Sequence, residues 1–258
     1  MADVTTELIN THGIPFKLAV RRELSRIPNV KILAEEFPVP YINGAAIDLL
    51  IEYRSEAKKI RYIFPIECKK GYVQVKKWIF FRDTHQIAKY VYHFKGKDLE
   101  VIQTQGITAK ATVCSEGIEI CEPKRKANPD PIEKAAEQIC IGFHGFIINE
   151  LKQRKKFVEG IEDMFVIPMV ITNAPLYIAD VIPGKLNIKT GNYDGNLGLM
   201  ETNMVILRHP FVKSPQDGKR LEIVKDKYQT FEELDYGNKE GILIVNSLSV
   251  GNLFPSHA

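Results

Sequence analysis

Two carboxylates, Asp48 and Glu67, stand inside runs of residues that are otherwise apolar, AAIDLLIEY and RYIFPIECK. In an antiparallel hairpin the two would lie directly opposite one another if the turn were centred between Ala57 and Lys58, where the apolar pattern breaks. We therefore expect the carboxylates to be cross-strand neighbours, with Cβ atoms about 5 Å apart. Because side chains of a strand alternate between its faces, Lys69 should share the face of Glu67.

Two carboxylates beside one ammonium group point to metal-assisted chemistry. Like charges opposite one another destabilise a sheet, and burial adds a desolvation cost that something must offset. A hard divalent cation, Mg²⁺ or Mn²⁺, does so, because it takes oxygen ligands from carboxylates and completes its shell with water and phosphate oxygens. Lys69 cannot bind the metal ion, but it can hold or deprotonate an attacking water or neutralise charge that develops on phosphorus.

An aspartate in one strand and Glu-x-Lys near the end of the next, after a helix and a first strand, resembles the PD-(D/E)xK nuclease superfamily. The motif here is Asp48 with IECK, and the resemblance covers the chain from its first helix to residue 95 and, more loosely, to residue 157. It implies a restriction-endonuclease-like fold and hydrolysis of phosphodiester bonds. It also implies that Asp48, Glu67 and the main-chain carbonyl of Cys68 bind the metal ion, with Lys69 as the catalytic lysine.

A second motif, QIAKY, places Gln86 and Tyr90 four residues apart in RDTHQIAKYVYHF, a segment for which we expect a helix. Some branches of the superfamily carry Q-x-x-x-Y on the helix after the Glu-x-Lys strand, which implies a catalytic role for both residues. On one helix face, the amide and the phenol could contact a phosphate or brace Lys69. A surface glutamine beside a half-buried tyrosine is an equally good interpretation. Glu137 and Gln138, in AAEQI, are rival candidates further along the chain.

The chain departs from the superfamily pattern at two positions near the site. Ile47 precedes the aspartate, where the motif has proline, and Lys17 follows the aromatic Phe16 of the first helix, where family members often have glutamate. Glu23, or Glu7 upstream, could replace that glutamate as an additional metal ligand. The simpler interpretation of Glu23 is a glutamate at the rim of the apolar stripe of the helix. This departure weakens the case for a second metal ion more than the case for the first, and the number of ions stays open.

Nucleic-acid contacts would have to come from local clusters of positive charge. The 258 residues include 35 Lys and Arg against 32 Asp and Glu, a net charge of only +3. Lys70, Lys76 and Lys77 flank the predicted site, where contacts with phosphates would be needed, although such runs are usually solvated faces. We expect a nucleic-acid partner, with DNA favoured over RNA. A homodimer or a larger complex is also compatible with the sequence.

The helices and strands that must position these residues are predicted from the periodicity of apolar residues and from the turn residues between them. Helices are predicted within residues 11–27, 82–94 and 130–157, and strands within 30–39, 45–53, 61–69, 77–81, 99–105, 111–120, 165–172, 176–182, 203–208 and 241–248. The fold class is therefore α/β, with a mixed central β-sheet flanked by helices. Through the resemblance, residues 1–158 are expected to form a restriction-endonuclease-like core. Residues 159–258 are a β-rich C-terminal extension that we expect to pack on the same domain.

Other features exclude several classes of protein. The four cysteines are too sparse for a disulfide framework and lack the spacing of a zinc site, which favours a reducing cytoplasm. The N-terminus does not read as a secretory signal, and the longest apolar stretch, ICIGFHGFII, is too short to span a bilayer. No membrane partner is therefore expected.

The prediction is a cytoplasmic, Mg²⁺-dependent nuclease. A role in restriction or in defence against phage follows from the resemblance alone. One alternative is a non-catalytic nucleic-acid-binding or scaffold protein that keeps the fold. Another is an unrelated α/β enzyme in which Glu-x-Lys is accidental. The presence of Asp48, Glu67 and Lys69 together argues against the first alternative, and both carboxylates on one sheet face would argue against the second.

Overall fold

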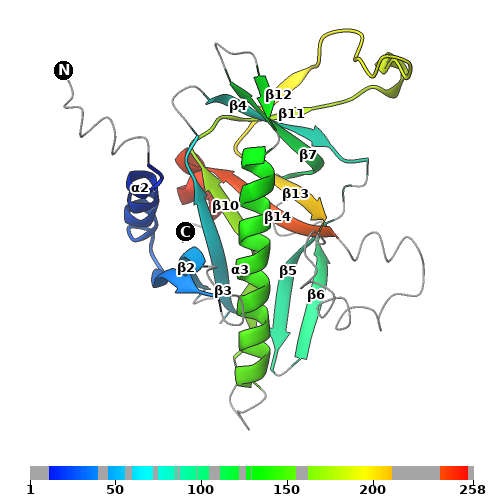
Figure 1. The fold of residues 1–258 in the computed structure, drawn as a ribbon. Coiled ribbons are helices and arrows are strands. Elements are labelled where there is room, and N and C mark those ends of the chain that lie inside the picture. The colour runs from blue at the N-terminus through cyan, green and yellow to red at the C-terminus, as the bar shows by residue number, and fades with distance from the viewer. Residues whose placement is uncertain are drawn as a thin grey trace, which may run out of the picture.

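The computed structural model has an α/β architecture in which one mixed β-sheet is accompanied by few helices among the described residues (Figure 1). It describes residues 12–39, 46–55, 60–71, 75–84, 86, 88–96, 98–104, 111–121, 126–128, 130–154, 162–210 and 239–254. The predicted α/β class is confirmed. Within these residues, no helix combines the length and the apolar character needed to cross a membrane.

The first described helix, α2 (Ile14–Leu24), lies within the segment for which a helix is predicted. Val20 and Leu24 are buried one turn apart, and Phe16 and Ile27 pack half-buried beside them. The apolar stripe expected from the sequence is therefore present. It anchors α2 against the sheet and fixes the direction of the polar side chains next to it.

Fourteen strands join in one sheet within the described part of the chain. They are β1 (Val30–Pro38), β2 (Ala46–Ser55), β3 (Ile60–Lys69), β4 (Val75–Arg82), β5 (Ala88–Lys95), β6 (Asp98–Thr104), β7 (Thr112–Cys121), β8 (Lys126–Asn128), β9 (Met164–Val166), β10 (Met169–Thr172), β11 (Leu176–Ala179), β12 (Leu199–Thr202), β13 (Met204–Pro210) and β14 (Lys239–Asn246). Their order is β12-β11-β4-β7-β13-β14-β10-β3-β9-β5-β6. Outside this order, β2 pairs with both β1 and β3, and β8 pairs with β7. Strands from both sides of residue 158 thus alternate in one sheet.

The strand that carries Glu-x-Lys, β3, has neighbours of both orientations. It pairs antiparallel with β2, parallel with β9 near its start and parallel with β10 near its end. A strand covered on both sides reads as a nearly continuous apolar run, which explains the sequence IFPI before Glu67.

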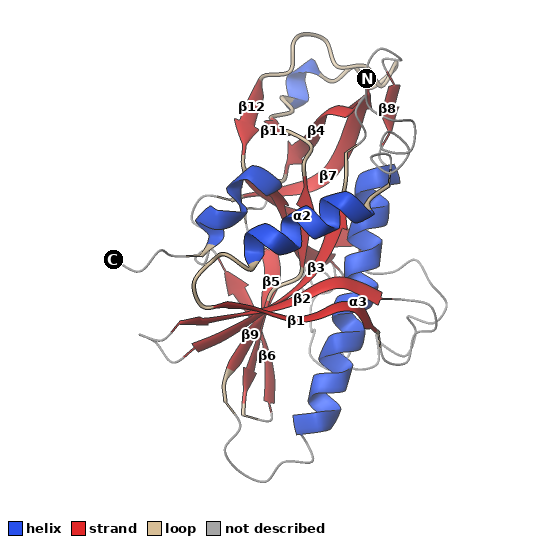
Figure 2. Cartoon of the chain, turned by 90° about the vertical axis from the view of Figure 1, so that its left-hand side faces the viewer, coloured by secondary structure: helices blue, strands red, loops and turns tan. Residues whose placement is uncertain are grey.

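Helices α2 and α3 (Asp130–Arg154) cover opposite faces of the part of the sheet formed by β2 and β3 (Figure 2). Leu24 of α2 packs in one core cluster with Ile66 of β3. Phe143 of α3 packs in another with Ile63 of the same strand. Two short 3₁₀ helices, η1 (Pro183–Lys185) and η3 (Ser247–Leu253), complete the described helical elements.

The helix predicted over residues 82–94 is wrong. The first of these residues ends β4, and residues 88–95 form β5, which pairs antiparallel with β6 and β9. The sequence YVYHF is rich in aromatic and β-branched residues, which suit a pleated surface. Pairing with β9, far along the chain, decides the conformation, and local periodicity does not reveal such a partner.

The single strand predicted over residues 165–172 is divided in two, β9 and β10. Pro168 lies between them and cannot donate a main-chain hydrogen bond, so the ladder is interrupted there. The N–H of Ile167 still donates to the carbonyl of Ile63, and the carbonyl of Pro168 accepts from Leu243. The interruption lets one segment flank both the start and the end of β3.

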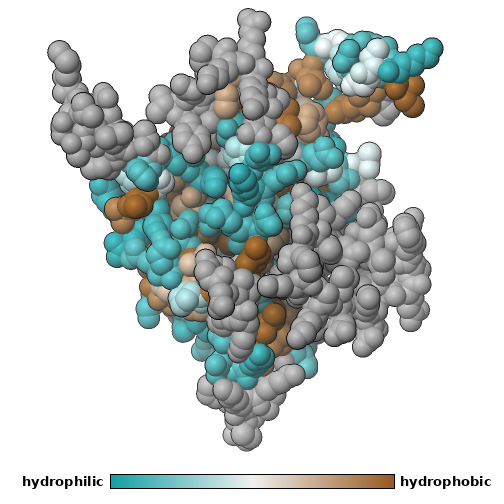
Figure 3. Space-filling view, viewed as in Figure 1, coloured by the Kyte–Doolittle hydropathy of each residue, from teal (hydrophilic) through white to brown (hydrophobic). Residues whose placement is uncertain are grey.

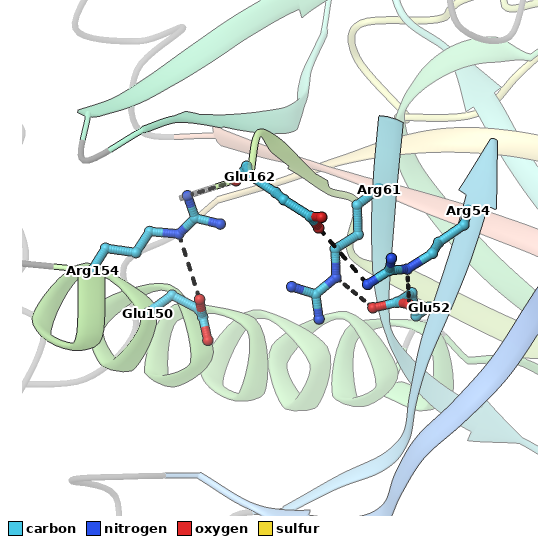
Figure 4. Close-up of polar contacts among 6 residues, drawn as sticks. All are labelled: Glu52, Arg54, Arg61, Glu150, Arg154 and Glu162. Carbon is cyan, nitrogen blue, oxygen red and sulfur yellow. Dashed lines mark hydrogen bonds and ion pairs between the residues drawn. The ribbon is translucent and has the colours of Figure 1, made fainter. Parts of the chain in front are cut away.

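Glutamates and arginines fix the far end of the β2–β3 hairpin beside the end of α3 (Figure 4). Nε of Arg54 donates to Glu52 over 2.6 Å, and Arg61 donates to the same carboxylate. Nη1 of Arg154 donates to the carbonyl of Glu162, whose carboxylate lies 3.7 Å from Arg54. Burial alone would raise the pKa of Glu52, but hydrogen bonds and positive charge from Arg54 and Arg61 outweigh it and lower the pKa. This buried carboxylate is therefore stably ionised.

The connection between β11 and β12 projects from the sheet as an arm, drawn in yellow at the upper right of Figure 1. The segment GNYDGNLG lies within it, and an antiparallel bridge joins Leu186 to Tyr193. Figure 3 shows apolar surface on this arm, where Ile188 is 98% exposed. The other exposed large apolar side chains of the arm and of β12 are Val181, Ile182, Leu186, Leu199 and Met200.

The first prediction concerns the close contact between α3 and β2. A methyl group on Gly142 would meet Cγ1 of the buried Ile47 at 2.7 Å. Overpacking costs about 1–3 kcal/mol and a glycine-to-alanine change in a helix returns about 1 kcal/mol, so Gly142→Ala should lower the free energy of unfolding by about 1 kcal/mol. Urea denaturation measures the change. Gly198→Ala, where an added Cβ meets nothing within 4 Å, is the control, and equal loss in both variants would contradict the tight contact.

Candidate active site

The register predicted for Asp48 and Glu67 is confirmed. Leu49 pairs with Ile66 in the antiparallel strands β2 and β3, so Asp48, one residue earlier, lies opposite Glu67, one residue later. The main-chain N–H of Cys68 donates to Oδ2 of Asp48 over 2.8 Å, which holds this carboxylate across the two strands. The hairpin therefore brings the two acids into side-chain contact.

Glu67 is buried, with 8% of its surface exposed, and its pKa is raised to about 8. Burial is the largest cause because it penalises the charged form, and the negative charge of Asp48 and a hydrogen bond with that residue add to it. The positive charges of Lys69 and Lys17 act in the opposite direction but are smaller in effect than burial. At neutral pH, Glu67 therefore holds a proton beside the carboxylate of Asp48.

Lys69 lies on the same face of β3 as Glu67, towards α3. Its Nζ is 3.5 Å from Oε1 of Gln138. Cys68, between the two, is buried in the core on the α2 side together with Ile66, and burial raises the pKa of its thiol. The alternation predicted along β3 is thus confirmed, and Gln138, a rival candidate in the sequence, is the glutamine that reaches Lys69.

A second lysine, Lys17 of α2, reaches the site although the sequence analysis did not include it among the site residues. Its Nζ forms an ion pair with Glu36 of β1 and lies 3.8 Å from Oδ1 of Asp48. Only 14% of the side chain is exposed. A signal was available, because Lys17 follows the aromatic Phe16 at the position where superfamily members often have glutamate. The side chain at this position is positively charged, opposite in sign to the carboxylates that it faces.

The donor atoms of the site fit one hard divalent cation. Two adjacent carboxylates, Asp48 and Glu67, can provide oxygen ligands, and the 22% exposed side chain of Asp48 leaves access from solvent. Mg²⁺ is commonly bound through one or two carboxylates, with water and substrate oxygens as its remaining ligands. Among the described residues there is no cluster of three or more His, Cys, Asp or Glu side chains suited to a metal ion. The fit is therefore to a cation held by two carboxylates.

The arrangement expected for Gln86 and Tyr90 is wrong, because the helix that would align them is absent from this described segment. Gln86 lies in the loop before β5, where its Nε2 donates to the carbonyl of Val113 and its Oε1 accepts from the N–H of Val113, both over 3.1 Å. Tyr90 lies in β5 and is 1% exposed in the core. The side-chain amide thus caps a neighbouring strand, and the geometric basis for a joint catalytic role is lost.

Glu23, predicted as an additional metal ligand, lies on the exposed side of α2. Its carboxylate accepts from Nη1 of Arg26 over 2.9 Å and lies 3.4 Å from Arg22. This matches the simpler interpretation, a glutamate at the rim of the apolar stripe. Glu7 lies outside the described residues.

The three lysines predicted to contact nucleic acid follow the Glu-x-Lys motif. Lys70 directly follows β3 and is half-buried. Lys76 lies on β4, but its side chain is outside the described part of the structure. Nζ of Lys77, on the same strand, lies 5.7 Å from the ring centroid of Tyr177 in β11, within the range of a cation–π contact. Contacts of these lysines with phosphates stay a prediction.

Comparisons of the chain with protein-family models, with curated proteins and with solved structures found no match. The chemistry of the site is therefore inferred from the contacts, burial and charge of Asp48, Glu67, Lys69 and Lys17.

The raised pKa of Glu67 predicts how the metal-free protein responds to pH. Between its ordinary value of 4.5 and about 8, the unfolded chain has released this proton while the folded chain keeps it. The free energy of unfolding should therefore fall as pH rises through this window, by up to about 1.4 kcal/mol per pH unit. Urea denaturation with a chelator present, at several pH values, measures the slope.

Glu67→Gln removes this titration and should flatten the slope, with the largest gain over wild type near pH 8. Glu116→Gln, an exposed glutamate on β7, is the matched control and should keep the wild-type slope. Identical slopes in wild type and Glu67→Gln would show that Glu67 is ionised in the folded protein throughout this range.

Proposed function

We propose that this protein is a metal-dependent nuclease that hydrolyses phosphodiester bonds, with DNA as its substrate. The observation that carries the proposal is the buried carboxylate of Glu67 opposite Asp48 and on the same strand face as Lys69. A fold stabilised by packing alone would not place two acids together in this way, because their mutual repulsion and desolvation oppose folding. Such a cost is characteristic of functional sites.

Asp48 and Glu67 would hold a single Mg²⁺ or Mn²⁺ ion, with the carbonyl of Cys68 as a further ligand by resemblance. When bound, such an ion supplies a positive charge for the phosphate oxygens and lowers the pKa of a water molecule. Cys68 contributes through its main chain, because its N–H keeps the carboxylate of Asp48 in place over 2.8 Å. Glu67 would exchange its proton for the ion.

Lys69 is the proposed catalytic residue, and it acts on the attacking water. Its ammonium group lies on the same side of β3 as Glu67, and Gln138 of α3 restricts its position through the 3.5 Å contact. From there it can orient the water and stabilise negative charge that develops on the phosphoryl oxygens. Gln138 acts through Lys69 and is therefore a positioning residue.

A restriction-endonuclease-like core is part of the proposal. It is supported by the order of α2, β1, β2 and β3, by the antiparallel β2–β3 hairpin and by the mixed sheet. We further propose that Lys70, Lys76 and Lys77 bind the phosphate backbone. A cytoplasmic location, a role in restriction or phage defence, and a homodimer or larger complex are predictions of the same kind.

A second candidate function is a nucleic-acid-binding protein without catalysis. The contact that favours it is between Lys17 and Asp48, because a lysine on each side of the carboxylates could neutralise them without any metal ion. Metal binding and cleavage distinguish the two functions.

The metal site is tested by ligand-induced stabilisation. Mg²⁺ or Mn²⁺ should raise the melting temperature of wild type, and Asp48→Ala or Glu67→Ala should abolish that rise, because each removes a ligand. Without metal, both variants should be at least as stable as wild type at pH 8, since each relieves the repulsion within the pair. A large loss of metal-free stability in both variants would mark the carboxylates as structural, and no stabilisation of wild type would favour the non-catalytic function.

Cleavage is tested on single-stranded and double-stranded DNA and RNA with Mn²⁺ or Mg²⁺, in single-turnover reactions at saturating protein. Lys69→Ala should slow cleavage by about 10²- to 10⁴-fold with little change in metal affinity. Lys70→Ala should weaken binding of the substrate but keep the rate at saturation, because Lys70 follows the strand and lies outside the shared face.

Lys189→Ala, on the exposed arm, is the control for both measurements. Full activity of Lys69→Ala, or equal losses for the variants at positions 69 and 70, would contradict the assigned mechanism.

A further inference from the structure

Three carboxylates form a row across the first three strands of the sheet. Phe37 pairs with Ile47 in the antiparallel strands β1 and β2, which places Glu36 opposite Asp48. Asp48 is in turn opposite Glu67 of β3. The metal-binding pair is thus the inner part of a longer acidic row, whose outer member is on the strand next to α2.

The two gaps in this row are bridged differently. Asp48 and Glu67 contact one another directly through a side-chain hydrogen bond. Between Glu36 and Asp48 lies the ammonium group of Lys17, paired with Glu36 and 3.8 Å from Oδ1 of Asp48. The ammonium group is covalently attached to the chain, so it stays between Glu36 and Asp48.

Both partners of this ion pair, Lys17 and Glu36, are carried by constrained backbone. Val20 and Leu24, on the following turns of α2, are buried in the core, so the helix cannot shift without exposing them. Glu36 has a φ of 48°, a left-handed conformation that is rare for a residue other than glycine. Such backbone strain persists where surrounding contacts impose it, and it is frequent at functional sites.

We infer that Lys17 takes the place of a second divalent cation, so that the site binds one metal ion, between Asp48 and Glu67, and excludes another between Glu36 and Asp48. The inference depends on the proposed function, because it concerns the number of ions in the same site. A divalent ion beside Glu36 would stand next to the ammonium group and be repelled by it. Without that group, Glu36 and Asp48 would form a second pair of facing carboxylates able to bind a hard cation.

Counting Mn²⁺ ions bound per chain by calorimetry and electron paramagnetic resonance tests the inference without relying on activity. Wild type should bind one ion. Lys17→Met, similar in length but uncharged, should bind two, with the first more tightly than in wild type. The double variant Lys17→Met with Glu36→Gln should return to one, because the outer pair loses a carboxylate. Lys189→Met, which removes an exposed positive charge from the arm, is the matched control and should bind one ion.

Two ions in wild type, or one ion in a folded Lys17→Met, would overturn the inference and leave the proposed nuclease function intact. Two ions in the double variant would also overturn it, since the second ion would then not depend on Glu36. No ion in wild type would overturn the proposed function and this inference with it. The count in wild type requires no substitution, so the inference stays falsifiable even if Lys17→Met fails to fold.

Discussion

The opposition of Asp48 and Glu67 across the β2–β3 hairpin is the constraint on which the rest of the site depends. Left alone, repulsion between the acids would favour a shifted register, but a shift of one residue would turn the flanking apolar side chains to the wrong face. Leu49 and Ile66, directly paired next to the acids, are fully buried, and each contributes about 1.5–3 kcal/mol. Apolar burial therefore holds the carboxylates together, and the pKa of Glu67 is raised by its own burial first and by the negative charge of Asp48 second.

The same hairpin shows how the surroundings decide the state of a buried carboxylate. Glu52, further along β2, has two arginines within hydrogen-bonding distance, and its pKa is lowered. Glu67 has another acid opposite it and lysines that only partly offset its burial, and its pKa is raised. The charge of Glu52 is thus already neutralised by the arginines, whereas Glu67 retains the capacity to exchange its proton for a cation. A site for an external ion is expected at the second and not at the first.

The parts of the site that could be predicted from the sequence are those determined by the order of apolar and polar residues along a single strand or turn. The alternation around Asp48 and Glu67, and the break in the apolar run between them, were enough to set their register and the face of Lys69. Residues 82–94 were predicted as a helix because the strand partner of β5 is distant in the sequence, and Gln86 was consequently misplaced. The approach of Gln138 to Lys69 depends on how α3 lies across the sheet, a packing arrangement that spacing along the chain does not specify.

The charges of the site can be summed to show how they would act under the proposed binding of one ion and an anionic substrate. Three carboxylates, on Glu36, Asp48 and Glu67, and two ammonium groups, on Lys17 and Lys69, would leave a net charge of −1 if all were ionised. One divalent ion changes this to +1, which attracts a phosphodiester, whereas the proton on Glu67 brings it only to zero. A second ion would raise the charge further, but Lys17 already provides that positive charge from within the fold. Its place on a helix anchored by buried Val20 and Leu24 makes it independent of the metal concentration, so that under the proposed function only one ion, between Asp48 and Glu67, would have to be acquired from solution.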